Sequence, residues 1–83
     1  MAKKILIIED EEPLVRMLTI RLEANGYQVI SATDGQKGLN MAREDQPNLI
    51  ILDIMLPGMN GFEVSANPGN PSAGVLSYLK IYQ

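Results

Sequence analysis

Two short runs of hydrophobic residues, each followed by acidic residues, dominate the pattern of this sequence. Residues 5–8 and 49–52 consist only of isoleucine and leucine. Continuous runs of this kind, without polar alternation, are typical of parallel strands buried on both faces. Glu9 and Asp10 follow the first run, and Asp53 follows the second. Because parallel strands end along one edge of a sheet, the pattern predicts three neighbouring carboxylates where open α/β sheets bind ligands.

The segment after the first run has the spacing of an amphipathic helix. Pro13 suits a first helical turn, where its missing N–H group needs no partner. Apolar residues then recur on one helical face, namely Leu14, Val15, Leu18 and Leu22. Gly26, after Asn25, predicts the end of this helix, and residues 27–32 predict a second strand.

A second helix follows, and its ends are also marked in the sequence. Asp34 can cap this helix with its side-chain oxygen, and Pro47 ends it. Leu39 and Ala42 are expected to face inward. Gly38 costs the helix about 1 kcal/mol relative to alanine.

The third strand is expected over residues 48–53. A tight loop over residues 56–61 and the start of a third helix at residues 62–64 are predicted after it. The order of elements is therefore βαβαβ with a further helix begun.

Size and charge limit the classes of function. Eighty-three residues make one small domain, and a net charge of −3 without a cluster of Lys or Arg argues against direct binding to nucleic acid. The lack of Cys excludes a disulfide framework. No signal peptide is recognisable, and no segment approaches the ~20 apolar residues of a membrane span. We therefore expect a cytoplasmic protein.

The predicted acidic edge needs a cation, because three neighbouring carboxylates repel one another. The chain has neither His nor Cys, so a hard, oxygen-binding ion such as Mg²⁺ is the expected partner. Taken alone, the four acids at 9–12 would most often be the solvated start of a helix, which the helix dipole favours. Asp53 at the end of the second run favours a metal site made of Glu9, Asp10 and Asp53. Glu11 and Glu12 are then helix-entry residues.

Four segments together carry a resemblance to a known family. They are residues 4–13, 26–29, 32–35 and 47–61, and the match extends over residues 3–64 with consistent spacing. The chain resembles a response-regulator receiver domain of two-component signalling, similar to CheY. The resemblance implies a three-layer, flavodoxin-like α/β fold with a parallel sheet in the order 2-1-3.

The resemblance also implies a role for each residue of the acidic edge. Asp53 matches the phospho-acceptor, which takes a phosphoryl group from a sensor histidine kinase or a phosphotransfer protein. Asp10 matches the carboxylate that binds Mg²⁺ directly, and Glu9 matches its neighbour, which usually binds through water. The backbone carbonyl of Met55 matches a further metal ligand. The chain is then a signalling module and not an enzyme, and a hydrolytic metalloenzyme is disfavoured because no separate general base is evident.

The resemblance ends at Ser65. A partial receiver domain over residues 1–64 is followed by a tail over residues 65–83 that does not match the family. Residues 65–74 have the composition of a linker, and residues 75–82 have that of a strand. The resemblance also implies a Lys and a Ser or Thr that contact the phosphoryl group. Neither has a match at the expected spacing, and only Lys80, Ser65, Ser72 or Ser77 could replace them.

A domain truncated in this way would leave its third strand at an open, apolar edge. Either the tail strand folds back onto that edge, or a second chain covers it. We expect a homodimer or a higher oligomer, through this edge or through the tail. An alternative function is that of a truncated or engineered fragment with impaired phosphorylation, whose main property is assembly.

Overall fold

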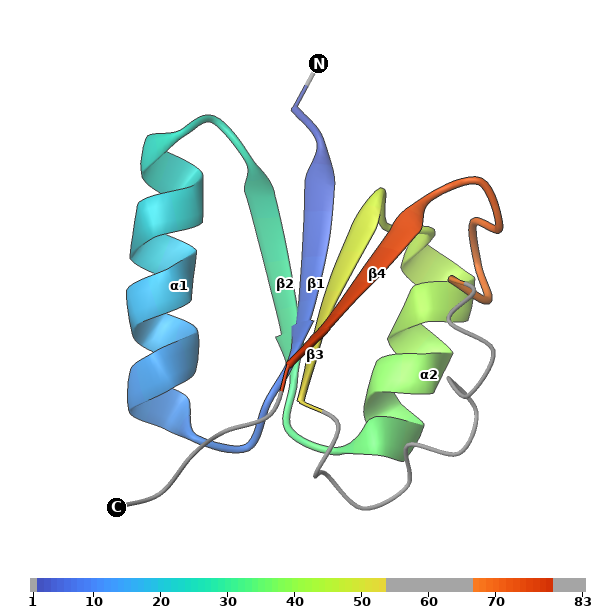
Figure 1. Ribbon diagram of the computed structural model, residues 1–83, viewed down its shortest axis with the longest axis horizontal. Coiled ribbons are helices and arrows are strands. Elements are labelled where there is room, and N and C mark those ends of the chain that lie inside the picture. The colour runs from blue at the N-terminus through green and yellow to red at the C-terminus, as the bar shows by residue number, and fades with distance from the viewer. Residues whose placement is uncertain (1, 54–66, 79–83) are drawn as a thin grey trace.

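A computed structural model describes residues 2–53 and 67–78, which form a parallel sheet with one helix on each side (Figure 1). The strand order is β2-β1-β3-β4, and every neighbouring pair is parallel. The flavodoxin-like fold class and the order 2-1-3 are thus confirmed, with a fourth strand added. The elements are β1 (Lys4–Ile8), α1 (Glu12–Ala24), β2 (Gln28–Ala32), α2 (Gly35–Asp45), β3 (Leu49–Asp53) and β4 (Gly74–Tyr78).

Some of the expected elements fall outside this part of the chain. The loop at residues 56–61 and the helix start at residues 62–64 lie outside the described residues, as do positions 79–82 of the tail. Neither of the two described helices has the length and apolar composition that crossing a membrane requires.

The main hydrophobic core lies between the sheet and α2. Alternate residues of β1 and β3 contribute to it, because successive side chains of a strand point to opposite faces. Leu39 and Met41 of α2 pack against it and are partly buried. Ala42 is fully buried, so the predicted inward face of α2 is confirmed. The buried members of this core are Leu6, Ile8, Ala42, Ile50 and Leu52.

Gly38 allows α2 to lie close to the sheet. A Cβ at this position would lie 2.5 Å from Cδ1 and 2.8 Å from Cγ1 of Ile8. Ile8 is itself fully buried in the core and cannot swing into solvent. The glycine that weakens the helix locally therefore permits the packing that fixes its position.

We expect Gly38→Ala to destabilise the protein even though alanine favours a helix. Overpacking a filled core typically costs about 1–3 kcal/mol, so we expect a net loss of about 1–2 kcal/mol in unfolding free energy after the helical gain. Urea denaturation of the two proteins measures the difference. In an Ile8→Val background, which lacks the nearest atom, the substitution should cost less. A Gly38→Ala protein more stable than wild type would contradict the close approach.

The helix ends follow the sequence signals. Gly26, just after α1, has a φ of +89°, which glycine adopts readily. Asp34 caps α2, its Oδ1 accepting a hydrogen bond from the backbone N–H of Lys37 at 2.8 Å. Gln46 follows α2 in the left-handed conformation, with a φ of 48°, before the buried Pro47.

Helix α1 covers the opposite side of the sheet less completely. Pro13 lies in its first turn, as predicted, but no residue of α1 is fully buried. The helix contacts β2. The side chains of its predicted inward stripe are all half-buried, namely Leu14, Val15, Leu18 and Leu22.

The tail forms β4, which pairs with β3 from Leu49↔Gly74 to Asp53↔Tyr78. The expectation that the edge of β3 is open to a second chain is therefore wrong. The hydrogen-bonding groups of β3 are already taken by a strand of the same chain. Of the two alternatives left by the sequence, the structure has the tail folded back.

Two residues hold the start of the tail segment against the rest of the domain. The side chain of Asn67 is fully buried and donates a hydrogen bond to the carbonyl of Pro47 at 2.8 Å. Its Oδ1 accepts from the N–H of Gly69 at 3.2 Å. A Cβ on Gly69 would overlap the backbone carbonyl of Ala42. The tail is thus docked on the C-terminal part of α2 before β4 begins.

Candidate functional site

Three acidic residues meet at the edge of the sheet where β1 and β3 end. Ile8 of β1 is paired with Leu52 of β3, so the next residues along the two strands, Glu9 and Asp53, lie side by side at this edge, where Asp53 is the last residue of β3. The N–H of Glu9 still donates to the carbonyl of Ala32 at 3.0 Å, which extends the ladder between β1 and β2 by one bond. The site therefore lies directly at the end of the paired strands.

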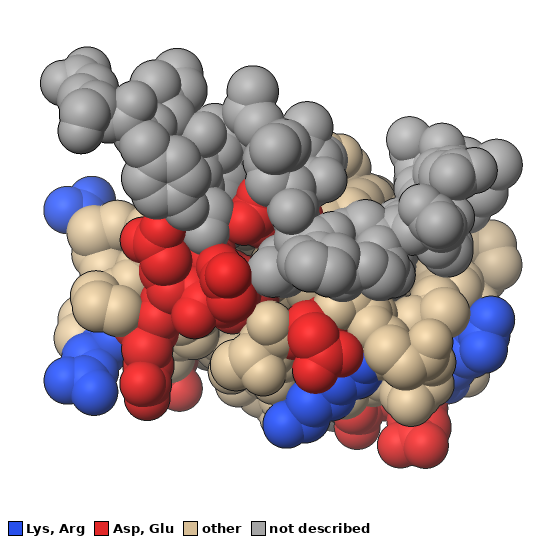
Figure 2. All heavy atoms as spheres, turned by 90° about the horizontal axis from the view of Figure 1, so that it is seen from below, with Lys and Arg blue, Asp and Glu red and all other residues tan. Residues whose placement is uncertain are grey.

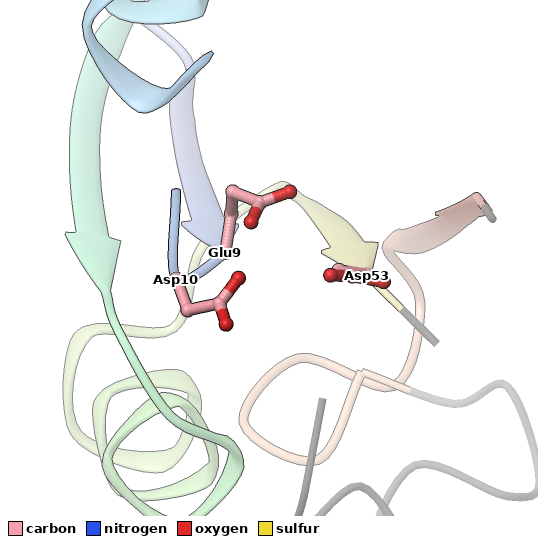
Figure 3. A group of neighbouring side chains, drawn as sticks. All are labelled: Glu9, Asp10 and Asp53. Atoms are coloured by element: carbon pink, nitrogen blue, oxygen red, sulfur yellow. The ribbon is translucent and has the colours of Figure 1, made fainter. Parts of the chain in front are cut away.

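Carboxylate oxygens of Glu9, Asp10 and Asp53 all lie within 4.8 Å of one another. Glu9 and Asp53 are buried, whereas Asp10 is exposed. Figure 3 shows the two carboxylates that follow β1 on one side and Asp53, at the end of β3, on the other. Acidic side chains also gather on the face of the molecule seen in Figure 2. The predicted convergence of these three residues is thus present in the structure.

The start of α1 fixes the orientation of Glu9. Its Oε2 accepts a hydrogen bond from the N–H of Glu11 at 2.8 Å, and Glu11 is the residue that precedes α1. The carbonyl of Glu11 accepts hydrogen bonds from the N–H groups of Leu14 and Val15 in the first turn of the helix. The positive end of the helix dipole therefore lies beside the acidic group.

This arrangement also separates the acids at the site from the acids of the helix entry. Glu12 lies in the first turn of α1. Neither it nor Glu11 belongs to the group of three carboxylates that lie close enough to share a ligand. Glu11 and Glu12 therefore fit the interpretation as residues at the start of a helix. Glu9, Asp10 and Asp53 fit the interpretation as a candidate metal site.

The donor set suits a hard divalent cation. All three candidate ligands are carboxylates, and the chain offers neither imidazole nor thiolate, so the site favours Mg²⁺ or Ca²⁺ over softer metals. Two of the carboxylates are nearly inaccessible to water, whereas Asp10 is exposed. A divalent ion bound there would offset the repulsion among the three carboxylates.

Other residues singled out in the sequence have different positions. Met55, Ser65 and Lys80 lie outside the described residues. Ser72 lies in the turn before β4, where its hydroxyl donates a hydrogen bond to Asn70 Oδ1 at 2.9 Å. Ser77 is paired with Leu52, one register position before Asp53. The tail thus places the hydroxyl of Ser77 near the carboxyl end of β4. The sequence position of Ser77 alone did not indicate this placement.

The comparisons with known proteins agree with this fold. The family model for the response regulator receiver domain matches residues 5–67. The alkaline phosphatase synthesis transcriptional regulatory protein PhoP of Bacillus subtilis (strain 168) is 50% identical over 64 residues, which are 77% of this chain and 27% of PhoP. This chain therefore spans only about a quarter of that relative.

Solved structures show the same similarity. The chemotaxis response regulator CheY4 of Vibrio cholerae is 33% identical, with a TM-score of 0.69 over 76% of this chain and 52% of that one. A response regulator from Burkholderia pseudomallei, solved with a phosphorylated aspartic acid, a calcium ion and citrate, is 26% identical, with a TM-score of 0.81 over 98% of this chain and 49% of that one. By its sequence and its fold, the chain belongs to the response-regulator receiver domain family.

Proposed function

We propose that this chain is a Mg²⁺-dependent phospho-acceptor module of two-component signalling and that Asp53 receives the phosphoryl group. The observation that carries the proposal is the convergence of Asp53 with Glu9 and Asp10 within 4.8 Å. Asp53 sits at the end of a buried central strand, which holds its carboxylate in place. A fixed nucleophile beside a cation site is what phosphoryl transfer requires.

Each residue has a defined task in the transfer. The donor is a phosphohistidine of the kinase or phosphotransfer protein. An oxygen of Asp53 forms a bond to phosphorus while the bond from phosphorus to the imidazole nitrogen of the donor breaks, and the electron pair of that bond stays on the nitrogen. Glu9 and Asp10 would hold the cation, with Glu9 kept in orientation by the N–H of Glu11. A Mg²⁺ ion held there would supply electrostatic stabilisation of the phosphoryl oxygens. We assign a further ligand, the backbone carbonyl of Met55, from the family resemblance.

The solved relative from Burkholderia pseudomallei supports this assignment. That protein carries both a phosphorylated aspartic acid and a calcium ion, and calcium shares with Mg²⁺ the preference for oxygen ligands. The partner in this proposal is a sensor histidine kinase or a phosphotransfer protein. The role is that of a signalling module without substrate turnover, and a cytoplasmic location is part of the same proposal.

Intact-mass spectrometry tests the proposal. The protein is incubated with Mg²⁺ and a small acyl phosphate donor, and we expect a mass gain of one phosphoryl group. The gain should disappear when Mg²⁺ is chelated and in Asp53→Asn. Asp45→Asn, which removes an exposed acid at the end of α2, is the matched control and should be phosphorylated normally. A folded wild-type protein that gains no mass, or a gain that persists in Asp53→Asn, would refute the assignment.

We also propose that copies of the chain associate. The route through an open third strand is excluded, because β4 occupies that edge. Among the described strands, β4 forms the outer edge of the sheet beside β3. Association is thus proposed through the tail, in addition to the phospho-acceptor function.

A further inference from the structure

Among the residues that the structure describes, the sheet ends at β4, and this strand has few of the features that usually protect an edge. Natural edge strands are commonly blocked by charged side chains, by proline or by a bulge. The sequence of β4 is Gly-Val-Leu-Ser-Tyr, and positions 64–79 contain no charged residue. The strand pairs with β3 in unbroken register over all five residues. It is therefore a regular, uncharged template for a further strand.

The other outer strand, β2, is better covered. It contacts both α1 and α2, which flank it on the two sides of the sheet (Figure 1). Among the described elements, β4 makes its contacts chiefly with β3. Leu76, at the centre of β4, is 57% exposed. An incoming strand would meet backbone hydrogen-bonding groups and an accessible apolar side chain at the same place.

We propose that β4 pairs antiparallel with β4 of a second copy of this chain, about a twofold axis near Leu76. The pairing joins the two four-stranded sheets into one continuous sheet. Leu76 of each copy faces its own counterpart, which reduces the exposed apolar area of both leucines. This inference locates the self-association proposed above and is independent of phosphorylation at Asp53.

The charge distribution favours a second copy of the chain as the occupant. All 10 acidic residues occur at or before Glu63, and the net charge is −3. Two copies that approach through their acidic faces repel each other, whereas the uncharged β4 edges meet without that repulsion. A twofold interface uses the same surface on both molecules, so that surface must be complementary to itself. Two antiparallel β4 strands that cross at Leu76 meet this requirement, because each strand pairs with an identical strand. Because each copy contributes only five residues of strand, we expect a weak dimer with a Kd of micromolar order or above.

Sedimentation velocity from micromolar to near-millimolar concentration, with folding checked by circular dichroism, tests this pairing. Wild type should show a concentration-dependent dimer. Leu76→Lys should raise the Kd at least about tenfold, because like charges then face each other across the axis, and Leu76→Glu should do the same. An equimolar mixture of the two variants should recover the dimer. Ile20→Lys is the matched control, since Ile20 is 62% exposed on α1, and it should associate like wild type.

The possible outcomes separate the parts of the proposal. A wild-type protein that stays monomeric at all concentrations overturns self-association, and with it the β4 pairing. Wild-type association that both Leu76 variants retain overturns the β4 pairing alone and moves the interface elsewhere. The same conclusion follows if Ile20→Lys weakens the dimer as much as Leu76→Lys does, or if the mixture of Leu76 variants stays monomeric. None of these results bears on the mass gain at Asp53.

Discussion

Gly69→Ala is expected to cause the largest loss of stability of any conservative substitution in the tail. The added Cβ would overlap the carbonyl of Ala42 and lie 3.0 Å from Cα of Arg43. These are backbone atoms of α2, which cannot rotate away as a side chain can. Overpacking typically costs about 1–3 kcal/mol, and we expect the upper end of this range or more. For a domain whose total stability is about 5–15 kcal/mol, that is a large fraction.

Two measurements check this expectation. Urea denaturation should show a lower midpoint for Gly69→Ala, and hydrogen exchange should show faster exchange of the β4 amides as the tail undocks from α2. Gly74→Ala is the matched control, because the nearest atom that its Cβ would meet among the described residues is Leu49 Cδ1 at 3.5 Å, an ordinary contact. We expect its stability to be close to wild type. An unchanged midpoint in Gly69→Ala would show that the turn does not sit on α2 as described.

The docked turn explains why the position of β4 could not be predicted from the sequence. Local composition indicated a strand in this region, but its partner depends on the bond from Asn67 to Pro47, which joins residues 20 positions apart. The fit of Gly69 over Ala42 depends in the same way on tertiary contact. A pattern of apolar and polar residues carries no information on either contact. The sequence therefore left two alternatives for the edge of β3.

Gly38 shows the same limit in a helix. Helical propensity measures the cost of glycine in an isolated helix, and on that basis alanine would be the better residue. The structure adds the side chain of Ile8, which fills the space that a methyl group would need. Propensity predicts only the local cost of this glycine, whereas the packing against Ile8 depends on the fold.

The acidic site was predictable because topology alone brings its members together. Parallel strands buried on both faces are almost uniformly apolar, so the polar residue that ends each run marks the carboxyl edge of the sheet. Glu9 and Asp53 followed from that rule, and Asp10 from its place next to Glu9. The hydrogen bond from Glu11 to Glu9 was not predicted, because it depends on how the chain turns into α1.

Mg²⁺ is expected to raise the melting temperature of this protein if the three carboxylates form its binding site. A ligand at about ten times its Kd stabilises the folded state by about 1.4 kcal/mol, and a domain of this size shifts by about 4–8 °C per kcal/mol. We therefore expect a rise of roughly 6–11 °C at such a concentration. Thermal denaturation followed by circular dichroism, with and without Mg²⁺, measures this shift.

Asp10→Asn should lose most of this rise, and it is the most informative variant of the three. Asp10 is exposed, so its replacement by asparagine should leave the fold intact, whereas Glu9 also orients the start of α1 through Glu11. Glu44→Gln removes another exposed acid, this one from α2, and should keep the full response. NaCl at matched ionic strength screens repulsion among carboxylates without occupying a site, so it should reproduce little of the shift. An equal shift with NaCl, or in Asp10→Asn, would mean that the carboxylates respond to screening and do not bind the ion as a group.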